Sequence, residues 1–342
     1  MRKAIWAGAL LATGVAVMGA AAREAKAETV VRIQDYPGLG NLLYRVAASK
    51  GFCAKHGIRC EMQPIPAAPL GMQALLAKSI DVALPPPEVA INAAIKGADI
   101  RVIGSGAQRN PFQVIVRPDL DVPDGNDDFK PMMLALKGRK IGVPARGAGG
   151  ELLFVQLANL AGLKASDYTF VSVGAPNTSY GALKSKQIDA SMTFEPSASI
   201  CEVIKDCKAA YIGSRASGPK EITGTNGAST LLVVTKDMID RSPDTVRAVV
   251  AAGNDAEAFM QDPANLKEVI AIAGQNSKIN IPRGDEVLAA SVTSRIPSFR
   301  MALSRPALKQ VVANMIATGQ LAKPFDTDGF VYDATVKPGG GQ

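Results

Sequence analysis

The sequence predicts an α/β protein built from two similar lobes, and three observations lead to this. Short hydrophobic runs alternate with helical segments of about ten residues, the pattern of βαβ units and a mostly parallel sheet. The pairs Ala74-Leu75 and Ile80-Asp81 recur at the same spacing as Ala182-Leu183 and Ile188-Asp189. The chain has 342 residues, of which 47% are hydrophobic and 20% charged, and this suits about two well-cored domains.

The first 27 residues have the pattern of a secretory signal peptide. Arg2-Lys3 form a charged start, residues 4–22 form an apolar run, and Ala25-Lys26-Ala27 fits an A-x-A cleavage site. We therefore predict cleavage before Glu28 and a periplasmic protein. An uncleaved anchor is the alternative, but the small residues of the run would make a weak membrane span.

The mature chain then alternates strands with helices. We predict strands at residues 30–33, 58–64, 80–84, 100–103 and 112–117. We predict helices at residues 42–50, 70–79 and 88–96, of which the first and last are ended by Gly51 and Gly97. Residues 119–130 are acidic and polar, with Pro and Gly, and predict a surface connection to a second unit.

The second unit has the same alternation. Its predicted strands are at residues 140–143, 168–173, 188–194 and 209–212, and its predicted helices at 151–161, 178–186 and 197–205. Residues 213–229 are rich in Gly, Ser and Thr and indicate a linker back to the first unit, whose sheet we expect to include the strand at 230–235. Further helices are predicted at 243–260, 263–274, 285–293 and 306–318, and a loose tail at 336–342.

A glycine-rich loop joins the strand at 140–143 to the helix that follows. Residues 145–150 contain one arginine, Arg146, and no Ser, Thr, Asp or Asn that could cap the helix. The free N–H groups of the helix start could therefore bind an anion. In the alternative interpretation this is an ordinary loop in which Glu151 satisfies the helix dipole. The loop lacks the Lys-Ser/Thr of a nucleotide-binding P-loop.

Composition excludes several classes of function. Aromatic residues make up only 5% of the chain and no basic cluster accompanies the net charge of +7, so we expect no nucleic-acid partner. The single histidine, His56, lies where a helix ends and is expected to be a solvated cation, which leaves no triad and no His-rich metal site. Glu88 and Glu195 could form a carboxylate pair, although each is expected to be a helix-start residue. We predict binding without catalysis, and no cofactor.

Loops at the carboxyl ends of the predicted strands are the candidate binding surface. In open α/β sheets ligands bind at this edge, and two lobes would bring two such edges face to face. The candidate loops are at residues 36–41, 85–88, 105–110, 146–150, 177–178 and 194–196.

The four cysteines form two pairs that are close in sequence. Cys53 lies near Cys60, and Cys201 near Cys207, without a C-x-x-C spacing. In an oxidising compartment we predict two local disulfides, each stabilising by roughly 2–3 kcal/mol. Four buried thiols are the alternative.

The order of several short motifs resembles the substrate-binding components of ABC importers, in particular the nitrate/sulfonate/taurine-type periplasmic binding proteins. The motifs are Tyr36-Pro37-Gly38-Leu39-Gly40-Asn41, Gly51-Phe52, Ile80-Asp81-Val82, Pro85-Pro86-Pro87, Gly142-Val143-Pro144, Phe194-Glu195-Pro196 and Ala198-Ser199-Ile200. The resemblance implies a bilobal type II periplasmic-binding-protein fold with a two-strand hinge. It implies one lobe of residues 28–117 with 228–342 and another of residues 118–227, and a monomer that presents its closed form to an inner-membrane permease.

The resemblance also implies which residues line the cleft. They are Gly40, Asn41, Pro86, Pro87, Arg109, Asn110, Arg146, Gly147, Ala148, Gly149, Phe194 and Glu195. We expect Arg146 and the N–H groups of 147–150 to hold an acidic group, Asn41 and Asn110 to hydrogen-bond the polar remainder, and Phe194 to pack the apolar part.

Two departures from the family pattern bear on the ligand. Relatives that hold oxyanions often carry Ser or Thr where this chain has residues 147–150, and often Trp where it has Phe194. These differences weaken sulfonate or nitrate as the ligand and leave room for an aromatic carboxylate or a heterocycle. The alternative functions are an enzyme of the thiamine-pyrimidine-synthase-like branch of the fold and a periplasmic sensor.

Overall fold

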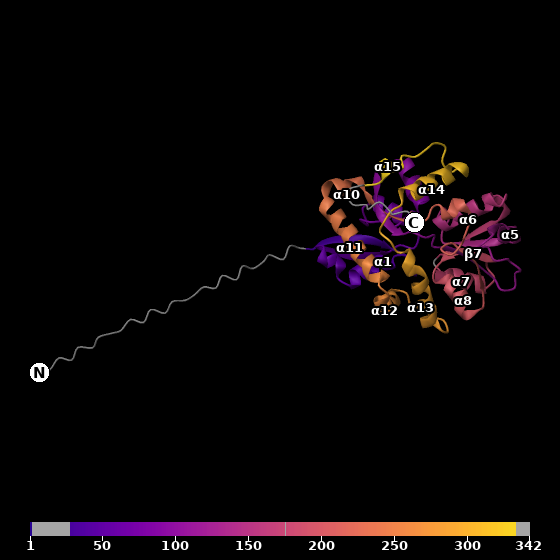
Figure 1. Ribbon diagram of the computed structural model, residues 1–342, viewed down its shortest axis with the longest axis horizontal. Helices are drawn as coiled ribbons and strands as arrows, with labels where there is room; N and C mark the ends of the chain where they lie inside the picture. The colour runs from indigo at the N-terminus through magenta and orange to yellow at the C-terminus, as the bar shows by residue number, and fades with distance from the viewer. Residues whose placement is uncertain (2–27, 175, 333–342) are drawn as a thin grey trace.

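The computed structural model describes residues 1, 28–174 and 176–332. Apart from Met1, the predicted signal peptide lies outside the described residues, as does the predicted tail at 336–342. The folded part has two halves, one made by the start and end of the chain and the other by its middle (Figure 1). Among the described residues, no helix is long and apolar enough to cross a membrane.

Strands and helices alternate as predicted through most of the chain. The strands are β1 (Thr29–Asp35), β2 (Ile58–Pro64), β3 (Ile100–Ala107), β4 (Phe112–Val116), β5 (Lys140–Val143), β6 (Thr169–Ser172), β7 (Ala190–Phe194), β8 (Lys208–Ile212) and β9 (Thr230–Thr235). The helices of the first two units are α1 (Leu42–Ser49), α2 (Phe52–Lys55), α3 (Ala68–Leu76), α4 (Pro87–Ile95), α5 (Phe129–Ala135), α6 (Gly149–Leu160), α7 (Pro176–Lys184) and α8 (Ser197–Ile204).

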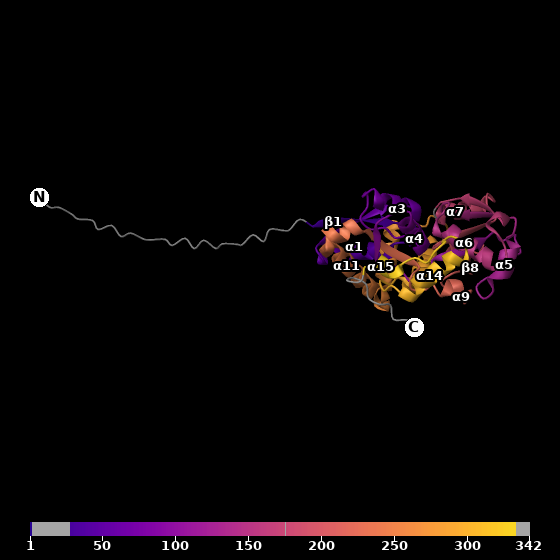
Figure 2. The same cartoon turned by 90° about the horizontal axis from the view of Figure 1, so that it is seen from above.

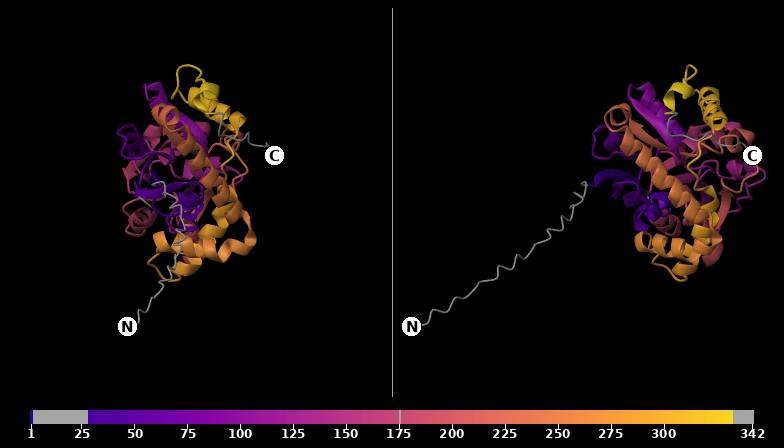
Figure 3. Two further views of the ribbon diagram at one scale, coloured as in Figure 1. Left: turned by 90° about the vertical axis from the view of Figure 1, so that its left-hand side faces the viewer. Right: turned by 60° about the vertical axis from the view of Figure 1, so that its left-hand side comes forward.

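The remainder of the chain contains β9 and otherwise mostly helices. Its helices are α9 (Lys220–Thr223), α10 (Lys236–Arg241), α11 (Pro243–Gln261), α12 (Leu266–Asn276), α13 (Gly284–Arg295), α14 (Arg305–Ala317) and α15 (Thr327–Phe330). The long α11 runs along the first half and packs against α1 (Figure 3). Helix α5 replaces part of the predicted surface connection, because Phe129, Met132 and Met133 are buried in the core of the second half.

The first half contains two two-stranded sheets, which isolated bridges connect into one layer. β1 pairs with β2 in parallel, and β3 pairs with β9 antiparallel. The predicted strand at 80–84 is reduced to single bridges, from Val82 to Ile33 and from Ala83 to Val233, because the prolines at 85–87 end it. These bridges join the two pairs of strands, and β9 lies in this layer as predicted.

The second half contains a five-stranded sheet in the order β6-β5-β7-β4-β8. β5 is parallel to β6 and β7, whereas β4 is antiparallel to β7 and β8. The sequence assignment placed residues 112–117 in the first lobe. That assignment is wrong for β4, whose hydrogen bonds all go to strands of the second half, from Phe112↔Phe194 to Val116↔Ala190 on one side. The other bounds of the two lobes stay a prediction.

The internal repeat seen in the sequence corresponds to equal places in the two sheets. Asp81 Oδ2 accepts a hydrogen bond from Arg32 N in β1 at 2.8 Å, and Asp189 Oδ2 accepts one from Lys140 N in β5 at 2.9 Å. The amide of each aspartate also donates back to the same strand residue. Asp81 therefore ties the segment of the single bridges to β1, and Asp189 ties the start of β7 to β5.

Three clusters of buried side chains form the cores. The first takes residues of the first half, from Val31 to Val331, and the other two take residues of the second half together with Val287 of α13. Helix α13 contacts both halves, because Leu288 and Val292 lie in the first core while Val287 lies in the third. Figure 1 shows α13 between α12 and α8.

Both predicted disulfides are confirmed. Cys53 is bonded to Cys60, and this bond joins α2 to β2. Cys201 is bonded to Cys207, and this bond joins α8 to the turn before β8. Each bond closes a short loop beside a helix end.

Candidate functional site

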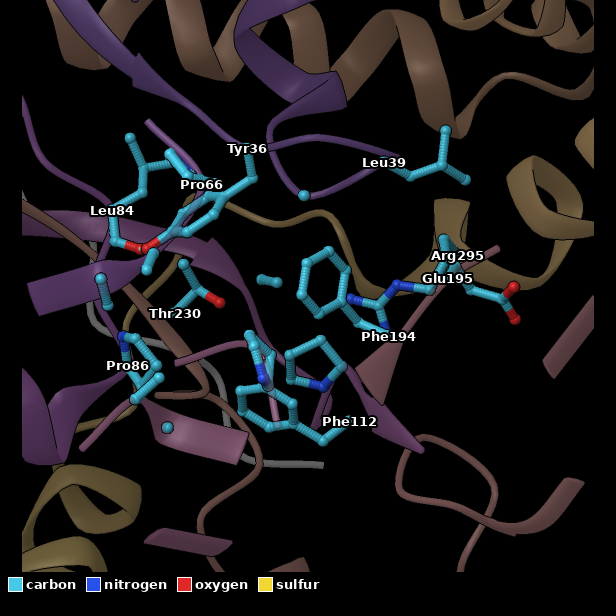
Figure 4. Close-up of a pocket in the computed structure, with 18 residues that line it drawn as sticks. Tyr36, Leu39, Pro66, Leu84, Pro86, Phe112, Phe194, Glu195, Thr230 and Arg295 are labelled. Atoms are coloured by element: carbon cyan, nitrogen blue, oxygen red, sulfur yellow. The ribbon is translucent and has the colours of Figure 1, made fainter. Parts of the chain in front are cut away.

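An apolar pocket lies between the two halves, where the strands of both sheets end (Figure 4). Its empty volume, counted out to its open mouth, is about 680 Å³. The junction of α4 and α6 is next to it, and Figure 2 shows these helices side by side where the halves meet. Strand-end loops of both sheets thus meet around one space, as the sequence predicts.

The first half supplies one wall of the pocket from several segments. Tyr36, Leu39 and Gly40 come from the loop after β1, Leu84 and Pro86 follow the bridges of Val82 and Ala83, and Thr230 begins β9. The hydroxyl of Tyr36 donates to the carbonyl oxygen of Leu84 at 3.1 Å, which fixes its ring against the wall. Burial raises the pKa of Tyr36, so its hydroxyl stays protonated.

The second half supplies the facing wall. Phe112 begins β4, Pro144 follows β5, Ala148 and Gly149 form the start of α6, and Phe194 ends β7. A Cβ added at Gly149 would meet Pro86 Cγ at 2.5 Å. The two walls therefore approach within van der Waals contact at this point, and only a residue without a side chain allows it.

The charged end of the pocket is Arg295, the last residue of α13. Its side chain is buried, with 5% of the residue exposed, and no described residue accepts a hydrogen bond from Nη1. Figure 4 shows its guanidinium pointing towards the ring of Phe194. Burial lowers the pKa of Arg295 to about 10, Glu195 opposes this and Arg109 adds to it, so the group is charged at neutral pH.

Glu195 lies near Arg295, but its hydrogen bonds are made with other residues. Its carboxylate accepts hydrogen bonds from Gln113 Nε2 at 2.9 Å, Ser291 Oγ at 3.2 Å and Ser294 Oγ at 3.3 Å. It also accepts the backbone N–H of Ser199 at 3.3 Å, in the first turn of α8. Because the two serines belong to α13, Glu195 connects a strand end of the second half to a helix of the C-terminal segment.

The residues predicted to line the cleft fall into three groups. Those on the wall of the apolar pocket are Gly40, Pro86, Ala148, Gly149, Phe194 and Glu195. Pro87 and Asn110 line a smaller, adjacent pocket that also contains Glu88. Asn41, Arg109, Arg146 and Gly147 line neither. That any of them contacts a ligand stays a prediction.

The glycine-rich loop matches the alternative interpretation in part. The guanidinium of Arg146 is paired with Glu151, and the backbone N–H of Gly147 donates to Glu151 Oε2 at 2.7 Å. The hydrogen bonds and charge of Glu151 raise the pKa of Arg146. The expected cradle of Arg146 and Gly147 is therefore filled by a side chain of the loop's own helix.

The two expected asparagines are also engaged within the chain. Asn41 is buried and its amide donates to the carbonyl oxygen of Gln34 at 2.7 Å, while its own Oδ1 has no partner among the described residues. Asn110 Oδ1 accepts the N–H of Phe112 at 2.9 Å and so shapes the entry to β4. Both fix strand-end loops.

Sequence reasoning missed Arg295, Thr230 and the apolar contribution of Phe112. Tyr36 belongs to the candidate loop at residues 36–41, and Leu84 directly precedes the candidate loop at residues 85–88. Nothing in the sequence marks Arg295 as a pocket residue, because an arginine at the end of a helix commonly interacts with the helix dipole. Only the seating of α13 against both halves brings it to the pocket.

Two α/β halves with strand ends facing across one pocket define a periplasmic-binding-protein fold of type II, as the sequence predicts. The chain belongs to the NMT1/THI5-like family, whose model matches residues 42–265. His56, which would be the reactive histidine of the enzyme alternative, lies in neither pocket and has its Nε2 2.8 Å from Asp255.

Relatives and solved structures agree with this assignment. A Brucella abortus protein provisionally named a binding protein is 27% identical over 248 residues, which cover 72% of this chain and 70% of that protein. A Bordetella bronchiseptica structure matches with a TM-score of 0.72 at 23% identity, over 91% and 94% of the two chains. The alkanesulfonate-binding protein of Xanthomonas axonopodis pv. citri, bound to MOPS, matches with a TM-score of 0.71 at 17% identity, over 89% and 98%.

Proposed function

We propose that this protein is the exported solute-binding component of an ABC importer. It captures a small anionic or polar organic solute between its halves and delivers it to a permease in the inner membrane. The observation that carries the proposal is the apolar pocket between the two sheets, lined from both sides and ending in one buried cation. Small-molecule sites have this composition, with mostly apolar walls and few polar groups.

The chain path supplies the means of closure. It crosses between the halves from β3 to β4 and again from β8 to β9. These two crossings are the proposed hinge. A solute that contacts both walls stabilises the closed arrangement more than an open one, and so shifts the population towards it. The permease would recognise that closed surface.

Binding is favoured over catalysis by the chemistry of the walls. The pocket-lining residues of the described chain include neither histidine nor cysteine. Their titratable side chains are Tyr36, Glu195 and Arg295, and the first two are held by hydrogen bonds within the protein. The names of the relatives, a binding protein and an alkanesulfonate-binding protein, support the same choice.

The test is a melting-temperature screen of the mature protein, residues 28–342, followed by titration calorimetry. The panel contains alkanesulfonates, taurine, nitrate, aromatic carboxylates and pyrimidines. We expect one class to raise the melting temperature and to bind at one site per chain without being altered. Recovery of a chemically changed compound would identify an enzyme instead. Absence of any binding across the panel, together with unchanged solute uptake in a deletion strain, would refute the proposal.

A further inference from the structure

We propose that Arg295 is the anion anchor of the pocket and that the solute is an organic monoanion with an apolar body. This inference rests on the proposed function, and it names the class of solute and the residue that selects it. Three properties of the described residues carry it: the unpaired guanidinium, the engagement of Glu195, and the apolar walls.

Arg295 is a buried charge that forms no ion pair with a described residue, although Glu195 lies close enough to act on it through space. A buried guanidinium is stable only when its donors are matched by acceptors, because its transfer from water is otherwise costly. Its Cζ lies over the ring of Phe299, 5.6 Å from the ring centroid. No described residue accepts a hydrogen bond from Nη1, although the side chain lies on the pocket wall and points into it.

Glu195 does not neutralise this charge by direct pairing. Its two oxygens already accept four hydrogen bonds, from Gln113, Ser291, Ser294 and the N–H of Ser199. In Figure 4 its carboxylate points away from the pocket, whereas the guanidinium of Arg295 points inward. The donors of Arg295 are therefore not taken up by Glu195, and the proposal assigns them to an acceptor on the solute.

A second cation strengthens the positive field. Arg109 is exposed, forms no ion pair with a described residue, and is close enough to lower the pKa of Arg295 by repulsion. A carboxylate or sulfonate has the planar or forked oxygens that a guanidinium binds with two hydrogen bonds. Both head groups fit this chemistry.

The rest of the wall sets the body of the solute. Apart from Arg295 and Glu195, it is made of apolar groups such as Leu39, Leu84, Phe112 and Phe194, together with the hydroxyls of Tyr36 and Thr230. The hydroxyl of Tyr36 donates its hydrogen bond to the carbonyl oxygen of Leu84. The hydroxyl of Thr230 is therefore the one that we expect to contact a small polar substituent of the solute. A second anionic group would lose its water against apolar walls, so dianions are excluded.

The experiment compares matched probes by titration calorimetry. Benzoate is paired with benzamide, benzenesulfonate with benzenesulfonamide, and isophthalate serves as the dianion. The wild-type protein is expected to bind at least one monoanion and to bind its neutral partner and the dianion much more weakly. In Arg295→Gln the affinity for the monoanion should fall about 30-fold or more, while that for the neutral partner changes little.

Two further variants keep the result decisive. Arg295→Lys retains the positive charge without the two parallel N–H donors of a guanidinium, and it should keep part of the affinity. It replaces Arg295→Gln in the test if that variant does not fold. Arg247→Gln is the matched control, because Arg247 is an exposed arginine of α11 that is paired with Asp244 and lines neither pocket, and it should leave affinity unchanged.

Failure of this inference can be told apart from failure of the proposed function. If the wild-type protein prefers neutral probes or binds no monoanion, or if Arg295→Gln retains full affinity, Arg295 is not the anchor. The proposed function still stands if the wider panel finds a solute, and it falls only if that panel and the uptake assay are both negative.

Discussion

Glu151 holds Arg146 and the start of its own helix with the same carboxylate. Oε1 lies 2.9 Å from Arg146 Nε, and Oε2 accepts the N–H of Gly147 at 2.7 Å. The carboxylate is buried while the arginine side chain is 63% exposed. The two partners therefore contribute unequally: Glu151 organises the loop, and Arg146 screens its charge.

Substitutions at this pair should show that inequality. Glu151→Ala removes the acceptor of Gly147 N and the negative charge at the start of α6, and should lower the free energy of unfolding by about 1–2 kcal/mol. Arg146→Ala breaks a largely exposed ion pair and should cost less than about 1 kcal/mol. Urea denaturation of both variants measures the difference, and equal losses would contradict this account of the loop.

Gly149 should control how closely the two halves approach. In Gly149→Ala the new methyl group would meet Pro86 Cγ at 2.5 Å and Phe112 Cζ at 3.1 Å. We expect weaker binding of any solute that needs the closed form, by about tenfold or more, with the free energy of unfolding changed little. Calorimetry measures the affinity, and small-angle X-ray scattering measures whether solute still compacts the protein.

Gly181→Ala is the control for that experiment. Gly181 lies in α7, and an added Cβ would meet no atom within 4 Å. The variant should bind normally and be more stable by roughly 0.5–1 kcal/mol, because alanine favours the helix. Equal affinity of both glycine variants would show that contact at Pro86 does not limit closure.

Glu195 should stabilise the protein through α13. Its carboxylate accepts Ser291 and Ser294 from that helix and Gln113 from β4. Glu195→Gln replaces one acceptor oxygen by a donor amide, so hydrogen bonds to a buried charge are lost, with an expected cost of about 1.5–3 kcal/mol. Thermal and urea unfolding measure it. Ser294→Ala removes one of these bonds and should cost less; the reverse order would place the stabilisation elsewhere.

Glu88 should make stability depend on pH. Burial raises the pKa of Glu88 above its ordinary value of 4.5. The folded chain then holds this proton more tightly than the unfolded chain, so stability falls as pH rises from below 4.5 through the raised pKa. Glu88→Gln should therefore be more stable than wild type at pH 7 and equal to it near pH 4. Equal differences at both values would show that Glu88 does not titrate in this way.

Much of the fold could be predicted because local patterns agreed with the tertiary structure. The spacing that links Ile80-Asp81 to Ile188-Asp189 reported a real equivalence, since both aspartates make the same hydrogen bonds to the neighbouring strand. The strand-end loops were found for the same reason, because prolines and glycines mark where strands stop. Local chemistry was enough for these features.

What failed depended on contacts between segments far apart in the chain. The side of the molecule to which β4 belongs is decided by pairing with β7 and β8, and its sequence is equally suited to either sheet. The role expected of Arg146 depended on whether Glu151 turns back onto the loop. Arg295 reaches the pocket through the placement of α13, which no local pattern encodes.

The seating of α13 in two cores has a mechanical consequence. Val287 is embedded on one side and Leu288 and Val292 on the other, so the two halves cannot rotate apart without uncovering apolar surface at this helix. Separation of the two halves therefore costs free energy at α13, which two bodies joined only by a flexible linker would not pay.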